Sequence, residues 1–209
     1  MTKITRDHVE WALVDRLRLM LEEPAHRTFN VTQTYSHFSS ILCWVMQRVR
    51  IKTSEIVSKD DKRAHDIFKE LVSTSIKDDP WFIHVAPVER IERIGATSFT
   101  IPAPQGFESH TAGRLLINLR DAVAHGGARI VEPFNVRGSL IGFAFSCAEF
   151  KGNGQDRKKV WSGKITLLQA DMQGIGLRLA ELYRDSIRPS AHRHDDGFGR
   201  DATSIKEVA

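Results

Sequence analysis

The chain has 209 residues, of which 41% are hydrophobic and 27% are charged, a composition typical of a globular protein and unlike a fibrous or disordered one. Its net charge of +4 permits a nucleic-acid partner without requiring one, because 26 acidic residues are interspersed with 30 basic ones. No stretch approaches the roughly 18 apolar residues of a membrane span, and the first residues lack the apolar core of a signal peptide. Cys43 and Cys147 lie in apolar segments, which predicts buried free thiols and a cytoplasmic protein.

The first part of the chain is predicted to be helical. Apolar residues recur at helical spacing within residues 5–23, and Pro24 ends that segment. Residues 31–49 carry a broad apolar stripe, which indicates a helix buried at the centre of a bundle. Residues 60–76 begin with an acidic pair that suits the positive end of a helix dipole.

The middle of the chain is more irregular. Residues 80–105 contain four prolines between short β-prone pieces, WFIHV and TSFTI, which predicts irregular chain or a short strand pair. A helix resumes near Glu108 and runs through LLINLRDAVAH. Gly126 and Gly127 follow it and are suited to a left-handed C-cap.

The last part of the chain predicts a β-hairpin followed by a helix. Residues 138–147 and 160–167 flank the polar turn KGNGQDRKK, and residues 169–186 are amphipathic. Residues 189–209 are rich in His, Asp, Gly and Arg and are expected to be disordered. We therefore expect one mainly α domain over residues 1–188, a helical bundle with a small antiparallel hairpin before its last helix.

One polar cluster interrupts an apolar helix and stands out as a candidate site. The common fingerprints of phosphate-binding loops, dinucleotide folds, CxxC pairs, HExxH zinc sites and GxSxG hydrolases are all missing from the sequence. The cluster consists of Asn118, Arg120, Asp121 and His125. A histidine suits general acid–base work, and an arginine suits the binding of a phosphate.

The spacing of this cluster constrains its geometry. Asp121 and His125 are four residues apart, so they share a helical face and can pair. Arg120 and His125 are five apart, which separates them by about 140° and roughly 7.5 Å of rise on a straight helix. Either the long Arg120 side chain swings toward the imidazole, or the pair meets in a groove that another protomer completes. A helix C-terminus and a nearby carboxylate both favour the imidazolium form of His125.

The motif Arg120-Asp121-x-x-x-His125 resembles that of the HEPN family, an arginine followed by a polar residue and, after a short gap, a histidine. The segment YSHFSSILCWVMQRVR and the hairpin-plus-helix ending are similar to a plasmid-borne HEPN subfamily, so that the resemblance covers roughly residues 5–187. It implies a HEPN-like helical bundle, a dimer that brings two motifs together, and RNA cleavage without a metal or other cofactor. Some HEPN toxins carry a tyrosine two residues after the histidine, where this chain has Gly127.

The leading hypothesis is a metal-independent endoribonuclease that acts by attack of the substrate's own 2′-hydroxyl. His125 would transfer protons, Arg120 would neutralise charge on the phosphate, and Asp121 would orient the imidazole. The expected RNA contacts are Asn118, Arg157, Lys158 and Lys159. A toxin or defence role is compatible with this chemistry, and broad RNA cleavage would call for an antitoxin-like partner. The alternative is a non-catalytic HEPN-like module that binds RNA, a nucleotide or a protein.

Each of these features also has a purely structural interpretation. Asp121 and His125 could form a capping and salt-bridge arrangement, and the basic residues 157–159 could be a solvated loop. The pattern His192-x-His194-Asp195-Asp196 suggests a metal site, but a solvated charge run is the simpler interpretation. The four tryptophans are dispersed and are predicted to pack in the core: Trp11, Trp44, Trp81 and Trp161.

Overall fold

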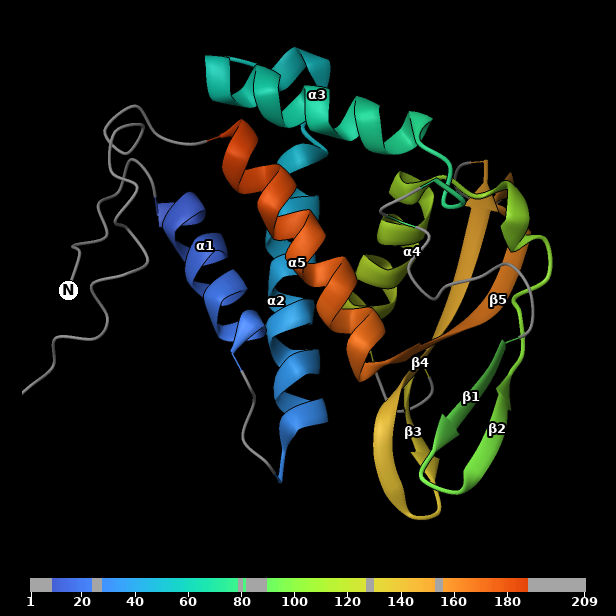
Figure 1. The fold of residues 1–209 in the computed structure, drawn as a ribbon. Helices are drawn as coiled ribbons and strands as arrows, with labels where there is room; N and C mark the ends of the chain where they lie inside the picture. Colours follow the sequence, from blue (N-terminus) through green and yellow to red (C-terminus); the bar gives the residue numbers. More distant parts are fainter. Residues whose placement is uncertain are drawn as a thin grey trace, which may run out of the picture.

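The computed structural model describes residues 9–23, 28–78, 81, 90–126, 130–152 and 156–187. Over these ranges the chain forms long helices and two antiparallel sheets, arranged as shown in Figure 1. The helices are α1 (Val9–Glu22), α2 (Asn30–Val49), α3 (Lys59–Ser73), α4 (Ala112–Ala124) and α5 (Gln169–Ser186), and the short 3-10 turns are η2 (Thr53–Glu55) and η3 (Phe107–Ser109).

The helix α2 is the centre of the helical part, as its apolar stripe predicts. It packs against α1, α3, α4 and α5, and Figure 1 shows α1 and α5 running along it. The side chains on its inner face are completely buried: Phe38, Ile41, Leu42, Val45, Met46 and Val49. Their burial excludes water from one continuous apolar core that also takes residues from α4, α5 and the strand β4 (Ser139–Lys151).

The start of α3 is fixed by a capping box. The hydroxyl of Ser58 accepts a hydrogen bond from the backbone N–H of Asp61, and the Asp61 carboxylate accepts bonds from the backbone N–H groups of Ser58 and Val57. Arg48 of α2 adds an ion pair with Asp61 at 2.6 Å. These bonds to the charged form lower the pKa of Asp61 to about 2. The acidic pair predicted to begin this helix is therefore confirmed and also links α3 to α2.

The prediction of a mainly α bundle with one hairpin is wrong, because the strands form two sheets and the fold is α+β. The larger sheet has the order β3-β4-β5 and the smaller one the order β1-β2, all antiparallel. The predicted hairpin is present but longer than expected. Of the two β-prone pieces within residues 80–105, TSFTI is a strand and pairs with RIERI, whereas WFIHV lies outside the described residues except for Trp81. The strands are β1 (Arg90–Ile94), β2 (Thr97–Ile101), β3 (Val131–Val136), β4 (Ser139–Lys151) and β5 (Lys158–Leu168).

Strand β3 was missed because its sequence, VEPFNV, contains Pro133. Proline has no backbone N–H to donate to a ladder, so strands that contain it are found at sheet edges. Pro133 pairs with Phe143 on β4, and β3 is one of the two edge strands of its sheet. The local sequence of β3 therefore argues against a strand. The strand forms nevertheless, because an edge position does not require every backbone N–H to pair.

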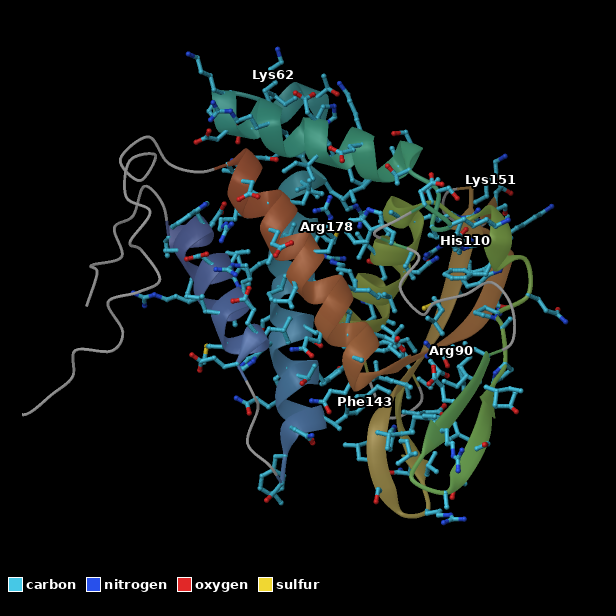
Figure 2. All side chains as sticks on the ribbon, viewed as in Figure 1. Lys62, Arg90, His110, Phe143, Lys151 and Arg178 are labelled. Atoms are coloured by element: carbon cyan, nitrogen blue, oxygen red, sulfur yellow. The ribbon has the colours of Figure 1, made fainter. Side chains whose placement is uncertain are left out.

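Two of the contacts that hold the sheets against the helices involve polar groups. Strand β4 lies along α4, where the Cys147 thiol is 3.6 Å from the carbonyl oxygen of Asn118. On β1, Arg90 donates two hydrogen bonds to the buried Asp171 carboxylate near the start of α5, at 3.0 and 2.6 Å. Figure 2 labels Arg90 between the small sheet and the helices. Both contacts join segments that are far apart in the sequence.

Three further sequence predictions concern the C-terminal tail, the C-cap of α4 and membrane-spanning segments. Residues 189–209, predicted to be disordered, lie outside the described residues. The helix α4 has His125 as its C-cap with φ −97°, Gly126 does not adopt positive φ, and Gly127 is not among the described residues. Within the described residues, no helix is both long and apolar enough to span a membrane.

Candidate functional site

The helix α4 positions the candidate site and presents two different faces. Its N-cap is Thr111, whose hydroxyl accepts a hydrogen bond from the backbone N–H of Arg114 at 3.2 Å. Leucines and alanines on one side join the core. Arg114, Asn118, Asp121 and His125 follow one another at intervals of four, three and four residues. This spacing places the four polar residues on one stripe of the helix.

Asp121 holds two arginines at the C-terminal end of α4. Its Oδ1 accepts a hydrogen bond from Nη1 of Arg120 at 2.9 Å and lies 3.8 Å from Nη1 of Arg50, the residue that follows α2. The side chains of Asp121 and Arg50 are 45% and 40% exposed, so solvent reaches the cluster. Burial raises the pKa of the Cys43 thiol, and the Arg120 guanidinium nearby opposes that rise. Arg120 and Arg50 therefore meet at the same carboxylate, close to the end of α2.

His125 lies one turn beyond Asp121 and is exposed. Its backbone N–H still bonds to the carbonyl oxygen of Asp121 at 3.0 Å, so it continues the helical path. Its side chain makes no hydrogen bond or ion pair with any residue in the described ranges. The expected pairing of His125 with Asp121 is absent there, because the Asp121 carboxylate binds the arginines instead.

Asn118, predicted to contact RNA, belongs to a different cluster. It is 5% exposed, and its Nδ2 donates to Oε1 of Glu149 on β4 at 2.7 Å. The Arg114 guanidinium donates to both oxygens of the same carboxylate, and Nε2 of His110 lies 3.1 Å from Oε1. Bonds from Arg114 and Asn118 lower the pKa of Glu149 against the opposing effect of burial. Asn118 thus supports the fold between α4 and β4.

His110 is a buried, titratable residue of this cluster that the sequence analysis did not identify. It is 1% exposed and packs against the rings of Phe107 and Trp161, with centroids 4.6 and 4.7 Å away. Burial, together with the nearby Arg114 charge, lowers the pKa of His110, although Glu149 opposes the shift. The sequence carries no local signal for this contact, because Glu149 lies 39 positions further along the chain.

The predicted basic turn lies at the other end of α4. Arg157, Lys158 and Lys159 are exposed at the tip of the β4–β5 hairpin, where Lys158 pairs with Lys151 and Arg157 lies 4.2 Å above the Phe150 ring. Figure 2 shows Lys151 close to His110, next to the beginning of α4. Arg114 and His125 are separated by roughly 16 Å along the helix axis. Within one protomer, the basic turn and the motif are therefore separate surfaces.

The remaining sequence candidates divide as follows. Trp11 and Trp81 are 4% exposed, which confirms core packing for these two, whereas Trp44 is 43% exposed and does not fit that prediction. The predicted buried free thiols are free, with Cys147 buried and Cys43 partly buried. Burial raises the pKa of the Cys147 thiol to about 12, which makes it unreactive. The His192–Asp196 segment lies outside the described residues.

No group of three or more His, Cys, Asp or Glu side chains suited to holding a metal ion occurs in the part of the chain that the structure describes. Comparisons with protein-family models, with curated proteins and with solved structures give no match for this chain. The exposed end of α4 offers two arginines, a carboxylate that holds them, and an imidazole without a partner among the described residues.

Proposed function

We propose that the protein is an endoribonuclease that cleaves RNA through the Arg120/His125 motif without using a metal ion. The observation that carries the proposal is the exposed end of α4. There, Arg50 and Arg120 share the Asp121 carboxylate, one turn from a histidine whose side chain is unengaged by described residues. Two guanidinium groups provide donors for a phosphodiester, and an accessible imidazole provides a proton carrier.

The proposed reaction is an internal transphosphorylation. His125 removes the proton of the ribose 2′-hydroxyl, or donates a proton to the leaving 5′-oxygen. The 2′-oxygen forms a bond to phosphorus while the bond to the 5′-oxygen breaks, which leaves a 2′,3′-cyclic phosphate and a new 5′-hydroxyl. Arg120 and Arg50 stabilise the negative charge that develops on the phosphate oxygens. Asp121 positions these two arginines, in place of the imidazole-orienting role expected from the sequence.

One motif supplies a single histidine, and the reaction needs both an acid and a base. Arg120 and His125 are five positions apart, so their side chains leave α4 in directions about 140° apart around the helix. We therefore include a homodimer in the proposal, with the ends of two α4 helices close to a twofold axis. Light scattering should give twice the chain mass at micromolar concentration. A fully active monomer would contradict this arrangement.

The cleavage assay uses purified protein with a labelled single-stranded RNA and its deoxy counterpart. The expected result is cleavage of the RNA in excess EDTA, with cyclic phosphate ends detected by mass spectrometry, and no cleavage of DNA because it lacks the 2′-hydroxyl. His125→Ala and Arg120→Ala should each reduce the rate by at least about a hundredfold, the usual scale for losing acid–base or charge-stabilising groups.

Arg114→Ala is the matched control, since Arg114 lies on the same helix but binds Glu149. It should leave the cleavage rate within about threefold, provided that the variant is folded at the assay temperature. Cleavage that needs added magnesium, or that survives His125→Ala, would reject the ribonuclease proposal. RNA binding without any cleavage would instead support the alternative of a non-catalytic RNA-binding module.

The proposal extends to compartment and control. RNA that is cleaved broadly in the cytoplasm requires restraint of the enzyme, so we include an antitoxin-like protein that covers the exposed end of α4. Such a partner would have to neutralise Arg50 and Arg120, whose carboxylate Asp121 is itself 45% exposed. An acidic segment has the complementary charge. Co-purification of an acidic protein that blocks wild-type cleavage, and binds poorly to the Arg120→Ala variant, is the expected observation.

A further inference from the structure

A pocket adjoins the motif on the far side of Arg50. It has a volume of about 290 Å³ and lies between the start of α1, the last turns of α2 and η2. Its lining includes Trp44, Gln47, Arg48, Arg50 and Glu55. Nothing in the ribonuclease mechanism above uses the first three of these side chains.

Trp44 gives the pocket an aromatic wall that the core does not need. The residue lies on α2 outside the stripe of completely buried side chains and is 43% exposed, whereas Trp11 and Trp81 are 4% exposed. An exposed indole face is a favourable platform for an unpaired nucleobase, because every base has a π-face that can stack on it. A solvent-facing tryptophan beside arginines therefore points to a nucleotide-like ligand.

The polar groups of the pocket are arranged to suit such a ligand. Arg48 is fixed by ion pairs with Glu10 at 3.1 Å and with Asp61 at 2.6 Å, so its guanidinium is a rigid part of the wall. Gln47 is exposed, and its amide makes no hydrogen bond to any residue in the described ranges. A free amide carries both donors and acceptors, which are what the edge of an unpaired base requires.

Arg50 connects this pocket to the proposed site. Its side chain lines the pocket, and its Nη1 lies 3.8 Å from the Asp121 carboxylate that also holds Arg120. A phosphate bound by Arg50 and Arg120 would place a neighbouring base beside Trp44. We propose that the pocket binds the unpaired base next to the cleaved phosphate, and that the enzyme is therefore selective for single-stranded RNA. This assignment rests on the proposed ribonuclease function.

Binding is measured by fluorescence anisotropy on the His125→Ala variant, so that substrate is not consumed. The probes are labelled hexauridylate, hexaadenylate and a 12-base-pair RNA duplex. Trp44→Ala should weaken hexanucleotide binding by about tenfold or more, the usual effect of losing one stacking platform. Duplex binding should change by less than about twofold, because paired bases cannot enter the pocket.

Three companion variants make the result specific. Trp44→Phe keeps an aromatic face and should retain affinity within about threefold. Gln47→Ala removes the amide that meets the base edge and should weaken hexanucleotide binding without changing duplex binding. Met20→Ala removes another half-exposed apolar side chain, on α1, and should have no effect on either probe. Unfolding midpoints measured on each variant separate loss of binding from loss of structure.

The outcomes distinguish this pocket from the ribonuclease proposal itself. Unchanged hexanucleotide affinity in folded Trp44→Ala overturns the pocket assignment, even if wild-type protein cleaves RNA as proposed. Equal losses for hexanucleotide and duplex also overturn it. Weakened binding confined to the single strands, together with wild-type cleavage, supports the assignment. The same weakening without wild-type cleavage would show that the pocket binds an unpaired base and would overturn its link to a cleaved phosphate.

Discussion

The two ends of the polar stripe on α4 are built from similar residues and have opposite surroundings. In the first half, Arg114 and Asn118 bind the Glu149 carboxylate, whose side chain is only 17% exposed, and His110 lies against it as well. In the second half, Asp121 is 45% exposed and holds Arg50 and Arg120, while His125 is exposed beyond them. The contrast lies in the two carboxylates, since Glu149 is largely covered and Asp121 is open to solvent, while the side chains of Arg114 and Arg120 are 39% and 26% exposed. We call the first the closed cluster and the second the open cluster.

The exposure of the two carboxylates separates polar groups that the fold requires from polar groups that are available to a ligand. A carboxylate largely removed from water must be paired, because burying an unpaired charge costs several kcal/mol. The donors around Glu149 meet that requirement and so are needed by the fold. Ion pairs that solvent reaches contribute on the order of 0–1 kcal/mol, so the pairs of Asp121 with Arg50 and Arg120 contribute little to stability. Residues of the open cluster are thus available for a ligand.

The largest stability effect is expected from Glu149→Ala. This change leaves the Asn118 amide and the Arg114 charge without their common acceptor, and should lower the free energy of unfolding by about 3 kcal/mol. Urea denaturation gives that quantity directly. Glu132→Ala is the control, because Glu132 pairs with the half-exposed Lys164 and its loss should cost less than about 1 kcal/mol. Similar losses for both variants would contradict the contrast between closed and open clusters.

A smaller effect is expected from comparing two arginines of the same helix. Arg114→Ala removes donors from Glu149 while Asn118 and His110 remain, so we expect a loss of about 1–2 kcal/mol. Arg120→Ala removes a partner of the exposed Asp121 and should cost less than about 1 kcal/mol. In the same urea titrations, Arg114→Ala should therefore lose more stability than Arg120→Ala. In the cleavage assay the order should be reversed, with the larger loss of activity in Arg120→Ala. Equal stability losses would count against this assignment of roles.

The closed cluster should also make stability depend on pH. Burial lowers the pKa of His110, so below its ordinary value of 6.5 the unfolded chain binds the proton more readily than the folded chain. Stability is then fully present above pH 6.5 and falls as the pH drops through the folded-state pKa. Denaturation midpoints measured between pH 7.5 and pH 5 should decrease for the wild type. In His110→Gln this part of the decrease should vanish, and an unchanged decrease would exclude His110 as its source.

Sequence periodicity was sufficient for the helices and for the place of the motif. The stripe within residues 31–49 predicted a central helix, and the motif lies at the end of α4 as expected. Periodicity also explains Trp44: it is off the stripe, so a helical projection could have predicted its exposure. The general assumption that tryptophans pack in the core obscured that signal.

The contacts of the motif's neighbours could not be predicted in the same way. Asn118 and Glu149 are 31 residues apart, and they meet because β4 lies along α4. That placement depends on the three-stranded sheet, and the edge strand β3 of this sheet is hard to predict because it contains Pro133. Similarly, Arg50 reaches Asp121 only because α2 and α4 pack together. The local sequence shows which residues of α4 are polar. Which of them are covered from solvent depends on the packing of elements that are distant in the sequence.

The smallest stability effect is expected from Asp121→Asn, which sharpens the contrast because it alters only the open cluster. An amide can still accept a hydrogen bond from Arg120, so the free energy of unfolding should change by less than about 0.5 kcal/mol. The substitution removes the negative charge between Arg50 and Arg120, and a phosphate at about 4 Å gains on the order of 1 kcal/mol in water. Hexauridylate binding to the His125→Ala variant should therefore tighten by up to about fivefold at 50 mM salt.

This gain should largely disappear at 500 mM salt, because ions screen exposed charges. The matched control is Asp185→Asn, an exposed carboxylate paired with Arg184 on α5, where RNA affinity should not change. Tighter binding in Asp121→Asn alone, lost at high salt, would identify Arg50 and Arg120 as the groups that meet the phosphate. Weaker binding would mean that Asp121 matters more for holding the arginines in place than for the charge it neutralises. An equal gain from both variants would mean that affinity follows only the net charge of the chain. That result would contradict the proposal that RNA binds at the exposed end of α4.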